Sequence, residues 1–262
     1  MFDSLFDLPL VVVGAAILIL LCAFALGGLA IFSRYILPRL KLGPEESVFT
    51  SAMMQAIMVF YGLAVALIAV SVWQTYTDAA ATISRESTAI GVLYRQMSGY
   101  PEPLRSELRQ ELREYVEYVI KEAWPQQHRG QVPSGGVEKV NDVEAKLVTF
   151  EPATEGQKLL HGETLRAYSQ LIEARRLRLD AVLTGLPGPL WFVIVAGALV
   201  SLSSTFFFQV EDARLQSIQV VLLAIFVGMI IFIIFALDRP FRGDLGLRPE
   251  PYELIYDQLM KQ

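Results

Sequence analysis

Four long stretches without a single charged side chain constrain this sequence more than any other feature. They cover residues 8–33, 47–77, 181–210 and 215–237, and none of them contains Asp, Glu, Lys or Arg. An α-helix needs roughly 20 mostly apolar residues to cross the hydrocarbon core of a bilayer, and each stretch is long enough. The sequence therefore predicts an all-α integral membrane protein with four transmembrane helices.

Composition excludes several other classes of protein. All 22 basic and 27 acidic residues lie outside the four stretches, so a small soluble α/β enzyme is excluded. The first stretch exceeds the roughly 7–15 apolar residues of a signal peptide and follows Asp3 and Asp7 rather than basic residues, so we interpret it as a retained span. The single cysteine, Cys22, excludes an intrachain disulfide. The net charge of −5 gives no reason to expect nucleic acid as a partner.

The distribution of charge predicts four parts. We expect transmembrane helices 1 and 2 in residues 1–77, a soluble helical domain in 78–180, transmembrane helices 3 and 4 in 181–237, and a C-terminal cytosolic tail in 238–262. With four spans, both termini and the soluble domain lie on one side of the membrane.

Basic residues near the span ends predict the orientation, although not unanimously. Seven of them lie on the side of the termini and four on the other, which favours termini and soluble domain in the cytoplasm, with the spans in the inner membrane. Arg34, Arg39 and Lys41, which follow the first span, argue for the opposite orientation.

The second span is expected to continue as a helix into the soluble domain. No proline occurs from Thr75 to Tyr100, and apolar residues keep a helical spacing at Ile83, Ile90, Leu93 and Met97.

Three further helices are predicted in the soluble domain. An amphipathic helix follows Pro103 and is expected to end at Trp124 and Pro125, before a loop over 126–136. A short helix is expected over 137–150. Thr154 and Gln157 then form a capping box that starts a long helix reaching toward Pro187.

Several local sequences, taken in order, resemble the bestrophin-like family of membrane proteins. They are residues 73–76 with Glu86 beyond them, Leu93-Tyr94-Arg95, the helix from Arg105 to Tyr115, Ala174-Arg175-Arg176-Leu177-Arg178, and Leu237-Asp238-Arg239-Pro240-Phe241-Arg242-Gly243-Asp244. The last block is the most specific, although an arginine separates Phe241 from Gly243 where bestrophins have Pro-Phe-Gly. Bestrophins are pentameric anion channels whose second helices line one pore. The resemblance therefore implies a homo-oligomer, with a pentamer favoured, and a cytosolic helical domain.

One face of the second span combines small and polar residues and is the candidate pore lining. Its predicted pore-lining residues are Ser51, Gln55, Val59, Gly62, Leu63 and Ala66. Because the span has no charged residue, such a pore would have an apolar constriction that gates by dewetting. The alternative is a face that only packs against other helices, since small residues allow close approach in lipid.

A second group of candidates lies outside the spans, and we predict that it acts in gating or in contacts between subunits. It consists of Glu86, Asp238, Arg239, Phe241 and Arg242. The simpler alternative is that Arg239 and Arg242 lie among lipid head groups, with Asp238 paired to one of them, and that Glu86 forms a solvated or intersubunit salt bridge. Arg175, Arg176 and Arg178 are most simply an orientation signal beside anionic lipid.

No pattern in the sequence predicts catalysis, a metal site or a cofactor. The only histidines, His128 and His161, have no partner at metal-ligand spacing, and no phosphate-binding loop or serine nucleophile elbow occurs. The first functional hypothesis is therefore a homo-oligomeric, channel-like protein that passes small ions, with membrane lipids as its surroundings. The alternative is a non-conducting scaffold or signalling protein that acts through its cytosolic helices.

Overall fold

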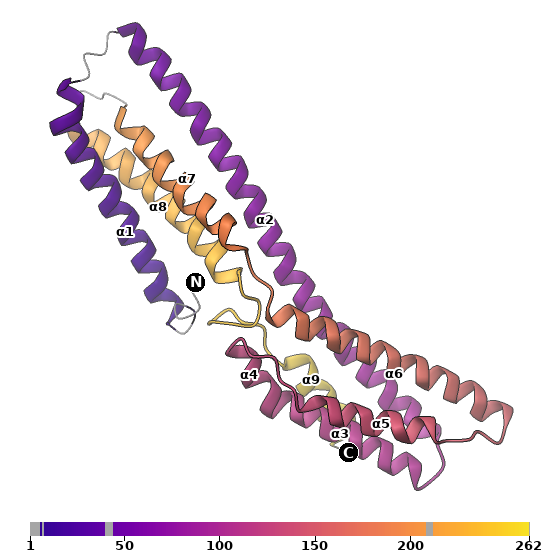
Figure 1. Ribbon diagram of the computed structural model, residues 1–262. Helices are drawn as coiled ribbons and strands as arrows, with labels where there is room; N and C mark the ends of the chain where they lie inside the picture. Colours follow the sequence, from indigo (N-terminus) through magenta and orange to yellow (C-terminus); the bar gives the residue numbers. More distant parts are fainter. Residues whose placement is uncertain (1–5, 7, 40–43, 208–211, 262) are drawn as a thin grey trace. The chain divides into compact units, whose positions relative to one another are not determined.

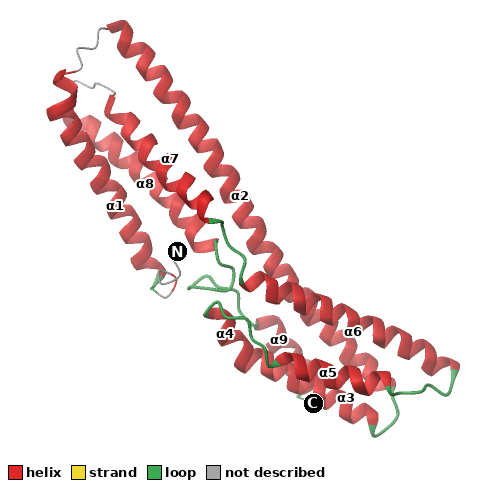
Figure 2. Cartoon of the chain, viewed as in Figure 1, coloured by secondary structure: helices red, strands yellow, loops and turns green. Residues whose placement is uncertain are grey.

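The computed structural model describes residues 6, 8–39, 44–207 and 212–261, and every regular element within these ranges is helical (Figures 1 and 2). Lys41, one of the basic residues that bear on orientation, lies outside the described residues. The chain forms two compact units. Unit 1 is Met1–Gln74 with Gly185–Asp238, and unit 2 is Thr75–Thr184 with Arg239–Gln262.

Unit 1 consists of long apolar helices. They are α1 (Leu10–Ile31), which a short π-helical turn extends to Ile36, the first part of α2 (Pro44–Gln96), α7 (Gly188–Ser204) and α8 (Ala213–Leu237). Four helices in the described residues are long and apolar enough to cross a membrane. This agrees with the four predicted spans, and the chain is a membrane protein.

Helix α2 is far longer than a membrane requires. It has 53 residues, whereas roughly 20 suffice to cross the hydrocarbon core. The helix begins in unit 1 and ends in unit 2 without a break, which confirms that the second span continues beyond its uncharged stretch. The absence of proline over this length permits such continuity, because an interior proline would remove a hydrogen bond and clash with the preceding turn.

Glycines allow α1 and α8 to approach each other closely within unit 1. A Cβ atom added to Gly14 would stand 2.9 Å from the ring of Phe232, and one added to Gly228 would stand 2.7 Å from Leu18. Lipid provides no hydrophobic driving force between helices, so close van der Waals contact at small residues has to hold them together.

Unit 2 is a helical domain with an apolar core. Its main helices besides the end of α2 are α3 (Leu104–Tyr118), α5 (Gly136–Val148), α6 (Glu155–Val182) and the short α9 (Glu250–Ile255). The core consists of buried side chains from all of these helices, among them Ile90, Leu93, Leu108, Leu112, Leu147, Leu171 and Tyr252. Helix α6 begins at the predicted capping box, in which Thr154 and Gln157 both make their reciprocal bonds.

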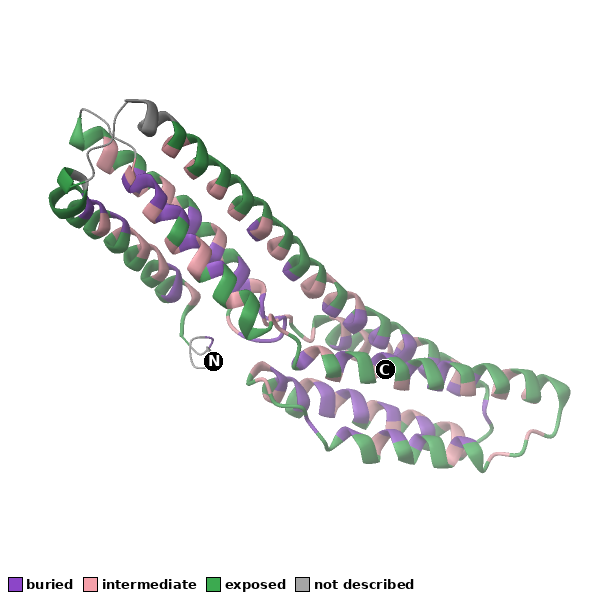
Figure 3. Cartoon of the chain, turned by 45° about the horizontal axis from the view of Figure 1, so that its top comes forward, coloured by how far each residue is buried: buried purple, intermediate pink, exposed green. Residues whose placement is uncertain are grey.

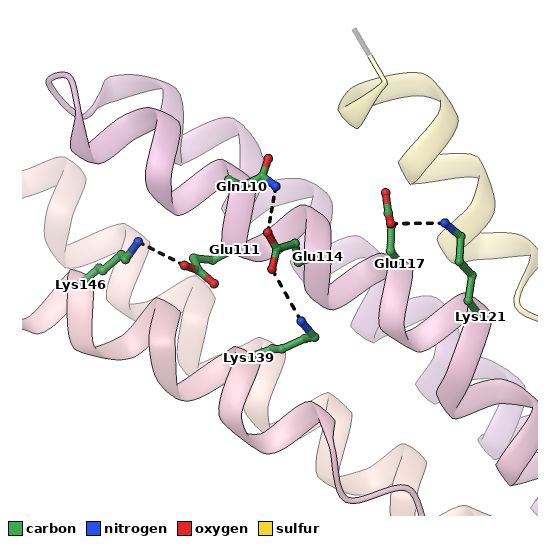
Figure 4. Close-up of polar contacts among 7 residues, drawn as sticks. All are labelled: Gln110, Glu111, Glu114, Glu117, Lys121, Lys139 and Lys146. Carbon is green, nitrogen blue, oxygen red and sulfur yellow. Dashed lines mark hydrogen bonds and ion pairs between the residues drawn. The ribbon is translucent and has the colours of Figure 1, made fainter.

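Salt bridges follow the surface where α3 and α5 lie side by side (Figure 4). Lys146 lies 3.2 Å from Glu111, and Lys139 lies 3.6 Å from Glu114. Because these side chains are partly exposed, each pair stabilises the domain only slightly. The buried apolar residues, not these pairs, hold α3 against α5.

The amphipathic helix after Pro103 was expected to end at Trp124 and Pro125, and this expectation is wrong. A π-helical turn over Val119–Ala123 leads directly into α4 (Trp124–His128), so the loop begins at Arg129 instead of Gln126. Pro125 lies in the first turn of α4, directly after the π-helical turn, and its fixed φ is compatible with a helix at that position. The expected short helix over 137–150 is present as α5.

Candidate functional site

The candidate pore-lining residues lie mainly on the exposed side of α2 in unit 1. Gln55, Val59, Gly62, Leu63 and Ala66 are all exposed in the single chain, and Ser51 is half-buried. Figure 3 shows this part of α2 largely in the colour of exposed residues. The single chain therefore leaves this face free to meet lipid, water or another copy of the chain.

The opposite side of α2 packs into the apolar core of unit 1. Val65 and Val72 are buried there together with Ile194 of α7 and Ile231 of α8. Tyr61 orients the helix, because its hydroxyl donates to the carbonyl oxygen of Ile194 at 3.0 Å. This packing turns the candidate pore face away from the core.

Gly197 is the point where the Tyr61 ring contacts α7. A Cβ atom there would stand 2.5 Å from two ring carbons, so we expect Gly197→Leu to lower the stability of the protein by about 1–3 kcal/mol through overpacking. Thermal unfolding of the purified protein in detergent measures this effect. Gly27→Leu is the matched control, since nothing lies within 4 Å of its Cβ position. Equal unfolding temperatures for the two variants would contradict the contact.

Glu86 forms a buried ion pair in unit 2. Its carboxylate accepts two hydrogen bonds from Arg178, from Nε at 2.6 Å and from Nη2 at 3.2 Å. The Tyr115 hydroxyl donates a third to Oε1 at 2.7 Å. Glu86 and Tyr115 are 0% exposed and Arg178 is 1% exposed. A two-pronged contact of this kind fixes both side chains as well as neutralising their charges.

Burial and charge together determine the protonation of this cluster. Burial raises the pKa of the Tyr115 hydroxyl, and the neighbouring Glu86 carboxylate raises it further, so this hydroxyl remains a donor. Burial by itself would lower the pKa of Arg178, but the Glu86 carboxylate holds it well above its usual value. The guanidinium also lies 6.0 Å from the ring of Trp124 and 5.8 Å from that of Tyr252, which favours the cation.

The ion pair corrects two expectations. Arg178 does not lie beside lipid head groups, and Glu86 is not solvated, because each is buried against the other. Helical spacing could have indicated this. Glu86 lies between Ile83 and Ile90 on the apolar stripe of α2, and Arg178 follows Leu171 and Ala174 on that of α6. A charge on such a stripe needs a buried partner.

Asp238 directly follows α8, as its C-cap residue, and lies in unit 1. Its carboxylate accepts hydrogen bonds from the backbone amide of Leu186 at 2.6 Å and from the Trp191 indole at 3.3 Å. Asp238 is buried, so it fastens the segment that leads into α7 to the end of α8.

Arg239 and Arg242 make contacts within unit 2. Arg239 donates to the carbonyl oxygens of Leu183 at 2.9 Å and Thr184 at 3.4 Å, just beyond the end of α6. Arg242 is buried against Gly130, where a Cβ atom would stand 3.2 Å from its Cδ. The expectation that Arg242 extends among lipid head groups is therefore wrong for the single chain.

Phe241 belongs to the same core as the buried ion pair. Its ring centroid lies 5.7 Å from that of Trp124, the residue whose ring also faces Arg178. The structure thus brings Glu86 and Phe241 into one core through Trp124. The sequence pointed to neither Trp124 nor Tyr115 as a member of this cluster.

Metal ligands do not gather anywhere in the part of the chain that the structure describes. Within it, no group of three or more His, Cys, Asp or Glu side chains is placed to hold a metal ion. The arrangement chiefly offers an exposed face on α2 and a buried ionic cluster in unit 2.

Comparisons with known proteins agree with this architecture. Residues 19–252 match the family model described as a Bestrophin-like domain. Crystal structures of two variants of a bacterial bestrophin homologue from Klebsiella pneumoniae superpose with TM-scores of 0.71 and 0.67, each at 12% identity. These matches cover 95% and 94% of this chain and 98% of the homologue in each case.

A further crystal structure, described only as that of a membrane protein, matches with a TM-score of 0.69 and 13% identity. That match covers 95% of this chain and 97% of the other. No curated protein matches the chain. Because the sequence identities are this low, the solved structures show only that the fold is shared.

Proposed function

This chain belongs to the bestrophin-like family, and from this premise we propose that it is a homo-oligomeric, channel-like membrane protein that passes small ions through an axial pore lined by α2. The observation that carries the proposal is the exposed face of α2. Gln55 places an amide on that face within an uncharged span. A polar side chain at membrane depth favours a protein or water neighbour over lipid.

The chemistry of this face determines how the proposed pore works. Residues 47–77 contain no charged side chain, so no ring of charges can select ions by their sign. Val59 and Leu63 instead provide an apolar constriction that stops ions when it loses its water. Gly62 and Ala66 leave room beside them, and Ser51 and Gln55 provide polar contacts nearer one end of the span.

The proposal extends to assembly and location. The family resemblance favours a pentamer in the inner membrane, with the termini, the domain of residues 78–180 and the tail of 238–262 in the cytoplasm. A role in gating or in packing between subunits is proposed for Glu86, Asp238, Arg239, Phe241 and Arg242. They act indirectly, because their contacts within their own chain position the helices.

Ion flux into liposomes that hold the purified protein tests the proposal. We expect small ions to pass across the membrane, and we expect the mass of the protein in detergent to be that of several copies. Liposomes without protein are the control for leakage. Absence of flux for every small ion, over a range of pH and calcium concentrations, would contradict a channel and favour a non-conducting scaffold.

A further inference from the structure

A groove in unit 2 lies outside the residues to which we assign ion passage. It has a volume of about 430 Å³, within the range of roughly 300–1,000 Å³ typical of small-molecule sites. One side of α2 and one side of α6 line it, at helical spacing in each helix. The lining residues are Ser84, Arg85, Thr88, Ala89, Val92, Gln170, Glu173, Ala174 and Leu177.

Small residues give the groove its depth. Ala89 and Ala174 are buried, whereas Val92 is 41% exposed and Leu177 is 44% exposed. Larger side chains at the two alanine positions would fill the space between the helices. The two alanines therefore form the bottom of the groove, and Val92 of α2 and Leu177 of α6 lie beside them.

Two opposite charges line the same groove, and neither has a partner among the residues that the structure describes. Arg85 and Glu173 are both exposed, and neither makes a hydrogen bond or ion pair with any residue that the structure describes. They also do not pair with each other, since no nitrogen of Arg85 comes within 4.0 Å of a Glu173 oxygen. The space between these groups can therefore hold a molecule that contacts both.

We propose that this groove binds a free α-amino acid with an aliphatic side chain. Arg85 binds the carboxylate, because a guanidinium matches the two oxygens of that group. Glu173 accepts hydrogen bonds from the ammonium group. An anion without an ammonium group is repelled by Glu173, and an amine without a carboxylate is repelled by Arg85, so only a molecule with both charges satisfies both residues.

The remaining lining residues determine which amino acid fits. Val92 and Leu177 contact an aliphatic side chain, whose burial removes apolar surface of both partners from water. The amide of Gln170 provides a further polar contact at the side of the groove. This inference goes beyond the proposed channel, because the groove lies in unit 2 and binding can be measured without any ion flux.

Equilibrium binding of radiolabelled L-leucine to the purified full-length protein in detergent tests the inference. We expect saturable binding. Isocaproate, which lacks the ammonium group, and isoamylamine, which lacks the carboxylate, should compete with leucine on the order of tenfold more weakly or worse. This comparison needs no variant, so it stays informative even if a substitution disturbs folding.

Two variants then locate the site. Arg85→Gln and Glu173→Gln should each weaken leucine binding on the order of tenfold or more. Arg176→Gln, an exposed arginine of α6 that does not line the groove, should leave it unchanged. The mass of each variant in detergent should equal that of the unsubstituted protein.

Several results would overturn the inference. They are an absence of saturable leucine binding, equally good competition by isocaproate or isoamylamine, and variants that bind leucine normally. A changed oligomer mass in the Arg85→Gln or Glu173→Gln variant would also overturn it, because the groove would then be a contact between copies of the chain.

Discussion

Replacing Arg178 by methionine is expected to lower the free energy of unfolding by about 3–5 kcal/mol, because the substitution leaves the Glu86 carboxylate buried without its partner. The carboxylate would keep only the hydrogen bond from Tyr115 among the three that it now accepts. Chemical unfolding of the purified protein in detergent, followed by the loss of helical circular dichroism, measures the change. Arg176→Met is the matched control, since Arg176 is exposed in the same helix.

A double substitution separates the charge from the packing. When Glu86→Leu is combined with Arg178→Met, no unpaired charge stays buried, and apolar residues of similar size can replace a buried ion pair at little cost. We therefore expect the double variant to regain most of the stability that the single variant loses. If Arg178→Met unfolds like the unsubstituted protein, or if the double variant is the less stable of the two, the pair does not stabilise unit 2 in the way we infer.

Replacing Val59 by asparagine is expected to raise ion flux on the order of tenfold, because a polar side chain keeps an apolar constriction wet and lowers the barrier to ions. Flux into liposomes, normalised to the amount of protein incorporated, measures the change. Phe60→Asn is the matched control. Its side chain is as exposed as that of Val59 in the single chain, but it points about 100° away around the helix.

The two substitutions together decide which face of α2 lines the proposed pore. If Phe60→Asn raises the flux and Val59→Asn does not, the pore face is wrong although the channel is right. If neither substitution alters a measurable flux, ions do not pass an apolar constriction at this level of α2. A scaffold without conduction would show no flux in any of these proteins.

Local patterns in the sequence predicted most of the helices of this protein. Uncharged stretches predicted the four spans, and the Thr154 and Gln157 pair predicted where α6 begins, because both signals depend on neighbouring residues alone. The same local reasoning misplaced the end of the α3–α4 segment at Pro125. It did not allow for a π-helical turn, which places the proline in the first turn of α4.

Local spacing predicted which residues of the candidate site share a helix face, but it did not predict contacts between different helices. Helical periodicity grouped Gln55, Val59, Gly62, Leu63 and Ala66 on one face of α2, and the structure places that face outward in the single chain. Periodicity could not indicate which of several arginines would meet Glu86. The choice of Arg178 depends on how α2 and α6 pack, and Tyr115 joins them from α3.

The sequence by itself determined that this is a helical membrane protein with a charged helical domain. The polarity of each segment must match its surroundings, lipid or water, and that polarity can be read from the composition of the segment alone. Only the tertiary structure decided which polar groups share a buried environment. Glu86 and Arg178 are separated by 92 positions in the sequence, and their pairing results from the packing of helices that are distant in the chain. Arg85 and Glu173, which make no hydrogen bond or ion pair with any residue that the structure describes, line one groove for the same reason. The helices α2 and α6 become neighbours only when unit 2 folds.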